Sequence, residues 1–368
     1  MKTTTHNLKQ LIGLWLALTA VTEVFADPSP VIALSGFDPV ALTQGTETKG
    51  KDELQTTRGR YRYLFASAVN KAKFESAPEK YGIQLDGYCM KMGPLSGRGS
   101  PERWFVSEGR IYLFASESCR NSFKSDPAAF TDRADAPATG TDAEKKRGKE
   151  LIEHALNGLG GADKVDALKS VRWEAITVYE QEGKKTEMRQ TTTAALPDRL
   201  RLDYSYGDFR EGHALASGRL LEINAADEAT MLPEDVYECV RRKLYREPLA
   251  LLRTRNQPGF VAVAAGPGEI KGAKVDWVNV SYAGATSKLA VESASGRILA
   301  VVYRGRAPST MGEICKVYSD FKEMEGGLVL PQNSDVTYDG KAPSSPKPAS
   351  HSVALNVPIE PRLFPNSN

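Results

Sequence analysis

Val171-Arg-Trp-Glu-Ala-Ile-Thr-Val-Tyr179 alternates apolar and polar side chains, which is the pattern of a half-buried β-strand. Similar segments recur along the second half of the chain, separated by turn residues such as Ser295-Gly296 and Asp339-Gly340. These alternating segments are 171–179, 187–195, 199–204, 218–223, 274–282, 287–292, 298–303, 313–323 and 334–338. Antiparallel sheets with one covered face show this alternation. We therefore predict a large, curved antiparallel sheet.

Helical patterns border and interrupt this sheet. Residues 144–159 place apolar side chains on one side of a helix, and Gly160-Gly161 ends it. Residues 233–255 predict one or two further helices, broken at Pro248. Because a sheet needs a covering layer, we expect these helices against one of its faces. The predicted class is α+β, a half-barrel sheet with covering helices.

The chain is long enough for two domains. Its 368 residues, of which 41% are hydrophobic and 26% charged, exceed what one core usually serves and have an ordinary globular composition. Residues 134–146 lack apolar periodicity and are predicted to be a linker. The linker separates a small module, 27–133, from a larger domain, 147–368.

An internal repeat organises the small module. The segment Tyr63–Ser67 recurs as Tyr112–Ser116. At the same offset Phe74 matches Phe123, Ser76 matches Ser125, Pro78 matches Pro127 and Tyr81 matches Phe130. Each copy predicts an aromatic strand, a serine that caps a helix, and a proline that ends it. We predict a small α+β unit with its aromatic rings in the core.

The first residues are typical of an export signal. Lys2 and Lys9 precede the apolar run 11–21, and Val24-Phe25-Ala26 places small residues at the positions that signal peptidase reads. The alternative, a membrane anchor, needs a longer apolar run. We predict a signal peptide over 1–26 and a periplasmic or secreted location. No later segment is long and apolar enough to span a bilayer.

Charge and motifs favour neither nucleic-acid binding nor catalysis. The formal charge is only +2, so no strong field attracts nucleic acid or anionic lipid. The four histidines are scattered, and Gly93–Gly97 and Gly266–Gly272 match neither a nucleophile elbow nor a phosphate-binding loop. We expect a protein that is not an enzyme, and assign no catalytic residue.

The cysteines fall into two groups, Cys89 with Cys119 and Cys239 with Cys315. Because an exported chain meets an oxidising compartment, we predict the disulfides Cys89–Cys119 and Cys239–Cys315. The alternative for the first pair is a metal site. With Met92, these thiols offer the sulfur ligands that suit Cu(I), or Zn²⁺ with thiolates alone. Apart from copper or zinc there, no cofactor is predicted.

The small module resembles the YHS domain. The residues that carry the resemblance are 35–40 (Ser-Gly-Phe-Asp-Pro-Val), Tyr63–Ser67, Phe74 and 87–89 (Gly-Tyr-Cys). Residues 110–130 are similar to the second half of the related TRASH-type unit, a proposed heavy-metal binder. The resemblance implies metal ligands at Cys89 and Cys119.

This sequence departs from the TRASH pattern at the other two cysteines. Met92 stands where the second cysteine would be, and Ala115 where the third would be. The histidine that helps to name the YHS family is absent as well.

The larger domain is similar to the periplasmic lipoprotein-carrier family (LolA/LolB type). The likeness rests on 159–161 (Leu-Gly-Gly), 168–171, 321–331, 355–359 and 363–364. It implies a half-open barrel whose apolar concave face accepts acyl chains or other lipophilic ligands.

These features favour an exported binding or carrier protein of the cell envelope that holds a lipophilic ligand in its second domain. We expect an elongated apolar cleft between the sheet and helices 233–255, unless these helices and the tail 352–364 fill it. The alternatives are a metal-handling protein acting through the small module and a purely structural or interaction protein. The sequence predicts no oligomeric state.

Overall fold

The computed structural model describes residues 30–181, 184–307, 310–343 and 348–365. The predicted signal peptide, 1–26, lies outside the described residues. Residue contacts divide the chain into unit 1, Met1–Thr131, and unit 2, Asp132–Asn368. Within the described ranges, no helix combines the length and the apolar character that a bilayer crossing requires.

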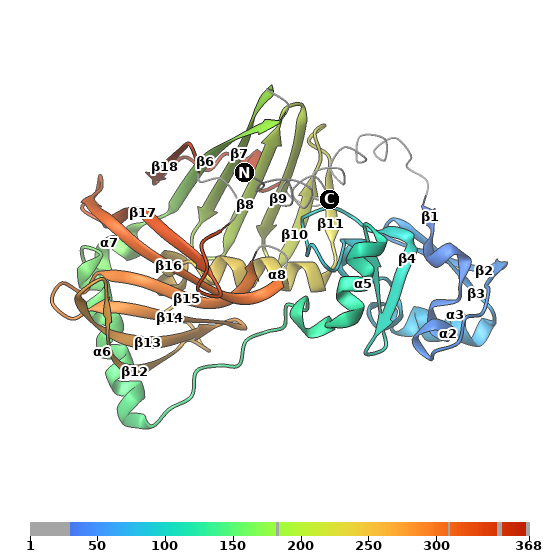
Figure 1. Cartoon of the computed structure of the whole chain (residues 1–368), viewed down its shortest axis with the longest axis horizontal. Coiled ribbons are helices and arrows are strands. Elements are labelled where there is room, and N and C mark those ends of the chain that lie inside the picture. Colours follow the sequence, from blue (N-terminus) through green and yellow to red (C-terminus); the bar gives the residue numbers. More distant parts are fainter. Residues whose placement is uncertain (1–29, 182–183, 308–309, 344–347, 366–368) are drawn as a thin grey trace, which may run out of the picture. The chain divides into compact units, whose positions relative to one another are not determined.

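Unit 1 contains the two copies of the repeat (Figure 1). The first copy comprises β1 (Val31–Ile32), η1 (Ala33–Gly36), α2 (Pro39–Thr43), β2 (Lys51–Arg58), β3 (Tyr61–Phe65), α3 (Ala68–Ser76) and α4 (Pro78–Tyr81). The second comprises η2 (Gln84–Gly87), β4 (Ser100–Ser107), β5 (Arg110–Phe114), α5 (Glu117–Ser125) and η3 (Pro127–Ala129). Strands β1, β3 and β2 form one sheet, and β4 and β5 form a hairpin.

Each copy begins its helix with the predicted serine cap. Ser67 accepts a hydrogen bond from the Asn70 amide, and Ser116 accepts one from the Cys119 amide, both at 3.2 Å. These bonds satisfy amide groups that the first helical turn leaves without partners. The strand–serine–helix pattern of the sequence therefore describes both copies.

Aromatic rings fill the interior of unit 1, as the sequence predicts. Phe74 of α3 lies 4.7 Å from Tyr63 and 5.2 Å from Phe65, measured between ring centroids, and all three rings are buried. In the second copy Phe123 occupies the matching place, 5.3 Å from Phe114. Each helix is held to its strand by one phenylalanine.

One carboxylate ties three parts of the first copy together. Asp38 is fully buried and accepts hydrogen bonds from the amides of Val40 and Ala41 at the start of α2. Its other oxygen accepts from the Ala66 amide at 2.7 Å and from Asn70 Nδ2 at 2.8 Å. Asp38 thus joins α2, the end of β3 and the first turn of α3.

Unit 2 consists mainly of two open antiparallel sheets (Figure 1). The seven-stranded sheet has the order β11-β10-β9-β8-β7-β6-β18, and the six-stranded sheet runs from β12 to β17 in chain order. The first contains β6 (Ser170–Gln181), β7 (Lys184–Ala195), β8 (Arg199–Tyr206), β9 (Phe209–Ala216), β10 (Arg219–Ile223), β11 (Ala229–Leu232) and β18 (Ser350–Leu355). The second contains β12 (Val261–Ile270), β13 (Ala273–Tyr282), β14 (Ala285–Glu292), β15 (Ile298–Ala307), β16 (Thr310–Glu323) and β17 (Val329–Tyr338).

Apolar alternation fixes which face of the six-stranded sheet is buried. Val278, Leu289 and Val301 are cross-strand neighbours on β13, β14 and β15, and all three are completely buried. Because side chains alternate along each strand, a slip of one residue would expose the whole row. The alternating segments of the sequence are thus the strands of a sheet with one covered face.

Helices cover these sheets, and the predicted α+β half-barrel class is confirmed. The helices of unit 2 are α6 (Asp142–Gly158), α7 (Ala162–Ala167), α8 (Glu234–Tyr245), α9 (Pro248–Arg253) and the 3₁₀ turn η4 (Pro361–Leu363). α6 contacts β12, β13 and β14, whereas α8 contacts β9 and β10 of one sheet and β14 of the other. The strands form two sheets and not one. β11 and β12, which α8 and α9 separate in sequence, are edge strands of different sheets.

The segment predicted as a linker, 134–146, is held by unit 2. α6 begins within it, at Asp142, where Thr141 and Glu144 form a capping box. Upstream, Asp135 accepts hydrogen bonds from the Thr286 amide at 2.9 Å and from Arg246 at 3.2 Å. The segment lacks apolar periodicity because polar groups, and not buried apolar side chains, hold it against unit 2.

Candidate functional site

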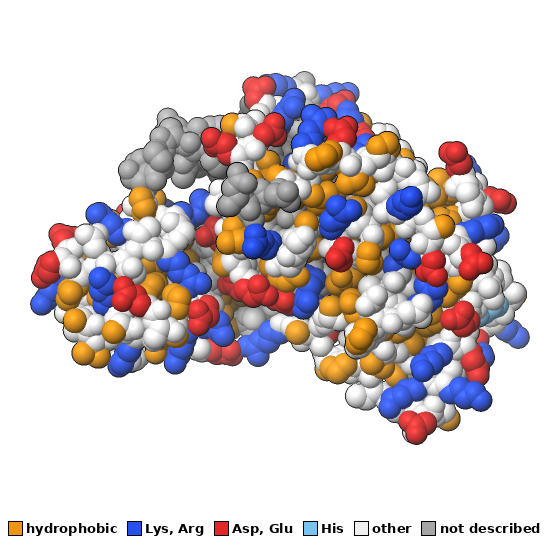
Figure 2. Space-filling view, turned by 180° about the vertical axis from the view of Figure 1, so that it is seen from behind, with side chains coloured by type: hydrophobic (Ala, Val, Ile, Leu, Met, Phe, Trp, Pro, Cys, Tyr) orange, Lys and Arg blue, Asp and Glu red, His pale blue; other side chains and the backbone are white. Residues whose placement is uncertain are grey.

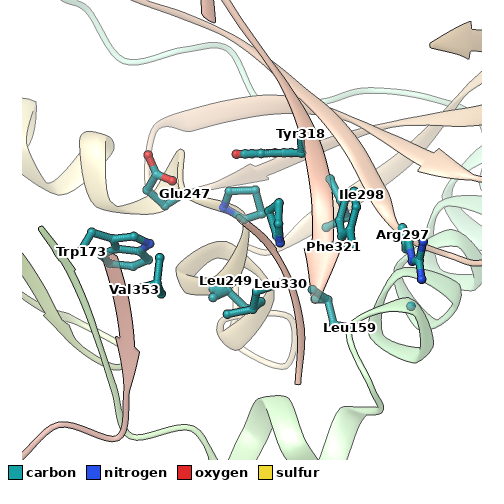
Figure 3. A pocket seen from close by; sticks show the side chains of 13 residues that line it. Leu159, Trp173, Glu247, Leu249, Arg297, Ile298, Tyr318, Phe321, Leu330 and Val353 are labelled. Carbon is teal, nitrogen blue, oxygen red and sulfur yellow. The ribbon is translucent and has the colours of Figure 1, made fainter. Parts of the chain in front are cut away.

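An apolar pocket lies inside unit 2, where the two sheets meet α9 (Figure 3). Its volume is 90 Å³. The lining residues are Gly158, Leu159, Trp173, Glu247, Pro248, Leu249, Arg297, Ile298, Tyr318, Phe321, Leu330, Pro331 and Val353. Figure 3 shows Trp173 and Val353 on one side, Ile298 and Phe321 on the other, and Leu249 and Leu330 between them.

Strand pairing brings these distant residues together. Trp173 of β6 and Val353 of the edge strand β18 are direct cross-strand partners. Phe321 and Pro331 face each other in the same way on β16 and β17. Leu249 reaches the pocket from α9. Proline is favoured at the first position of a helix, and Pro248 begins α9 as a separate helix after α8. The walls come from elements that share one buried core.

In the described part of the chain, the region between the sheets and α9 holds a small pocket rather than an elongated open cleft, which agrees with the alternative in which the helices and the tail fill it. The tail supplies β18, whose Val353 and Leu355 pack against the core, and α9 fills the same region with Leu249 and Leu252. These side chains narrow the space between the sheets and α9 to a cavity of 90 Å³. On the face drawn in Figure 2, apolar side chains of unit 2 lie among charged ones.

One charged pair stands at the edge of this pocket. Lys316 Nζ lies 2.6 Å from Glu247 Oε1, and the two side chains are 22% and 38% exposed. Burial by itself lowers the pKa of Lys316, but the Glu247 carboxylate, together with Tyr303 and Tyr318, raises that pKa well above its ordinary value. Burial also raises the pKa of the neighbouring Tyr318. Lys316 is therefore charged and Tyr318 neutral at physiological pH.

A more polar groove of 460 Å³ lies next to α7 and the chain after β18. Its lining residues are Leu168, Lys169, Ser170, Leu196, Arg199, Arg253, Asn356, Val357, Pro358 and Ile359. Leu249 of the apolar pocket and Arg253 of this groove are one helical turn apart on α9. The cationic side chains of Lys169, Arg199 and Arg253 thus line a groove that lies one turn of α9 away from the apolar pocket.

All four cysteines lie in the described part of the chain and are free thiols, so neither predicted disulfide is formed. Cys89 and Cys119 are nevertheless in contact, because a hydrogen bond joins their side chains. The hydrogen bond to Cys119 and burial raise the pKa of Cys89. The same bond, together with Ser116 and Lys91, lowers the pKa of Cys119 to about 5. Cys119 is thus the more acidic of the two thiols.

Met92, the third predicted sulfur ligand, meets this pair through its main chain. Its backbone and that of Ala115 hydrogen-bond to the Cys89 sulfur. The Met92 methyl group lies against Gly97.

Cys239 and Cys315 have separate surroundings, which is why the second predicted bridge is not formed. Cys239 lies buried on α8, where Arg242 donates to its sulfur at 3.4 Å. Cys315 is on β16 and hydrogen-bonds to Thr337 of β17. Burial raises the pKa of both thiols.

Three possible metal ligands that were not predicted from the sequence lie together on β9 and β10. Within the described residues, Glu211, His213 and Glu222 place one ligand atom each within 4.8 Å of one another. His213 Nε2 lies 3.2 Å from Glu211 Oε1, and the His213 side chain is completely buried. The spacing Glu-x-His on a strand, which puts both side chains on one face, was the available signal.

Comparisons with known proteins return structures but no sequence families. No family model matches the chain, and no curated protein matches its sequence. A DUF1329 family protein from Desulfovibrio piger is 11% identical, with 59% of this chain and 97% of that chain covered and a TM-score of 0.37. A putative outer membrane lipoprotein-sorting protein domain from Vibrio parahaemolyticus is 10% identical, with coverages of 59% and 95% and a TM-score of 0.35. A LolA superfamily protein from Nitrosomonas europaea is 9% identical, with coverages of 58% and 97% and a TM-score of 0.35.

Proposed function

We propose that the chain is an exported binding or carrier protein whose unit 2 holds a lipophilic ligand, such as an acyl chain. The observation that supports this most directly is the pocket between the sheets, whose walls include Trp173, Phe321, Leu330 and Val353. Transfer of a methylene chain from water into an apolar cavity is favourable, because each buried CH₂ contributes about 0.8 kcal/mol.

The pocket size sets how such a ligand would enter. At 90 Å³ it is smaller than the roughly 300–1,000 Å³ of drug-sized sites, so it takes the end of a chain only. A longer segment needs Val353 on β18 to move aside. Among the described strands β18 lies at the edge of its sheet, next to β6, which makes it easier to displace than an inner strand.

The cationic groove supports an acidic head group on the ligand. Lys169, Arg199 and Arg253 line it, and α9 connects it to the apolar pocket. A fatty acid with its chain beside Leu249 would bring its carboxylate towards these residues. A charge-assisted hydrogen bond there favours an anionic ligand over a neutral one of equal length.

A fluorescent fatty-acid titration tests the proposal. Val353→Phe fills the pocket with apolar atoms, and we expect it to weaken binding about tenfold, equivalent to 1.4 kcal/mol. Met231→Phe is the matched control, because Met231 is 61% exposed on β11, the opposite edge of the same sheet. Saturable binding that is equal in both variants, or no saturable binding at all, would reject the pocket as the ligand site.

A second candidate function is metal handling by unit 1. It is favoured by the contact between the Cys89 and Cys119 thiols and by the lowered pKa of Cys119, since thiolates bind soft metals. Titration with Cu(I) or Zn²⁺ tests this function, with Cys119→Ser as the disabled variant and Cys315→Ser as the control. Equal binding by both variants would remove the thiol pair as a site.

A further inference from the structure

Three side chains from two neighbouring strands converge inside unit 2. Glu211 and His213 are two residues apart on β9 and therefore lie on the same face of the sheet. Glu222 of β10 is the direct cross-strand partner of His213. Because sheet register sets these positions, the ligand atoms are already gathered within 4.8 Å before any ion arrives.

The surroundings of this cluster are apolar. Leu202 lies opposite His213 on β8, and Leu215 and Leu220 follow on the same face. These three leucines are 2% exposed or less, and His213 is completely buried. Placing an imidazole among leucines is unfavourable unless its nitrogens are bound. Both glutamates are partly exposed, which leaves a route from solvent to the cluster.

The charges of the three residues match a divalent cation. Two carboxylates beside one imidazole attract a divalent cation and offer it oxygen and nitrogen ligands. The imidazole binds such an ion in its neutral form. One nitrogen and two oxygens are ligands that Zn²⁺ uses at roughly 2.0–2.2 Å, with a fourth place for water.

We propose that Glu211, His213 and Glu222 form a binding site for a divalent transition-metal ion of the Zn²⁺ or Mn²⁺ type. The ion would link β9 to β10 beneath α8, which contacts both strands. This site is separate from the thiols of unit 1 and from the apolar pocket. Its existence therefore does not depend on the proposed lipophilic ligand.

Calorimetric titration of the chelator-treated full chain tests the site. Because thiolates bind Zn²⁺, the titration uses the Cys89→Ser, Cys119→Ser background, and Mn²⁺ serves as a second probe that prefers oxygen ligands. We expect one ion per chain and a rise in Tm with metal. His213→Gln and Glu222→Gln should each weaken binding about tenfold or more.

His351→Gln is the matched control, because His351 is exposed on β18 of the same sheet, and it should bind as the parent does. Glu222 is partly exposed, and glutamine has nearly the same shape as glutamate, so Glu222→Gln should fold. It therefore keeps the test valid if His213→Gln fails to fold. Absence of stoichiometric Zn²⁺ and Mn²⁺ binding by the parent would overturn the proposal. Equal binding by parent and Glu222→Gln would also overturn it.

Discussion

Replacement of Lys316 by methionine tests how strongly the charged pair at the pocket edge contributes to stability. Exposed ion pairs contribute about 0.2–1 kcal/mol, and loss of one partner from a fully buried pair costs about 3–5 kcal/mol. With side chains 22% and 38% exposed, Lys316 and Glu247 lie between these limits. We expect Lys316→Met to lower the free energy of unfolding by about 1–2 kcal/mol, because Glu247 loses its counter-ion.

Urea unfolding at pH 7, followed by tryptophan fluorescence, measures this change. Lys271→Met is the matched control, since Lys271 pairs with Asp335 at 2.8 Å on side chains 64% and 58% exposed. It should cost less than about 0.5 kcal/mol. The double variant with Glu247→Gln should be more stable than the sum of the single effects implies, by about 1 kcal/mol. Equal costs for the two lysines, together with zero coupling, would refute this account of the pair.

Three further predictions concern unit 1. Because the thiol of Cys119 has a pKa of about 5, it is a thiolate above that pH, and its alkylation by iodoacetamide should slow only as the pH falls through about 5; a decline already between pH 9 and 7 would contradict this. Phe74→Ala and Phe123→Ala should each destabilise unit 1 by about 3–5 kcal/mol in denaturant unfolding, because both rings are buried. Gly50→Ala places a Cβ 2.3 Å from the Leu64 carbonyl carbon, so thermal unfolding should show a lower Tm, and an unchanged Tm would show that the strand can shift.

The sequence predicts those parts of the fold that follow from a repeated pattern, either the alternation along a strand or the recurrence of a whole segment. Alternation over 274–282 and 287–292 indicates β13 and β14, and the recurring aromatic segment indicates both copies in unit 1. The division into two sheets could not be predicted, because it depends on which edges of β11 and β12 stay unpaired. Local side-chain patterns carry no information about that.

The candidate sites were predicted unevenly for the same reason. A Cys89–Cys119 pair was expected because the four cysteines fall into two groups along the chain, whereas the Glu211–His213 pair lies on β9, a strand that was not predicted. Glu222 reaches them through cross-strand register, which sequence spacing does not reveal. The sequence left open whether the tail 352–364 fills the cleft, because local patterns do not show that β18 pairs with β6 and covers the core from the far end of the chain.

The repeat in unit 1 gives its two copies different chemistry at one shared position. In the first copy, Asp38 joins the Ala66 amide to Asn70. In the second, Cys89 meets the backbone of Ala115 and the side chain of Cys119, which occupy the places of Ala66 and Asn70. A carboxylate and an amide cannot be oxidised to a covalent link, whereas two thiols can. An oxidant would therefore lock one half of the duplicated unit and leave the other half unchanged.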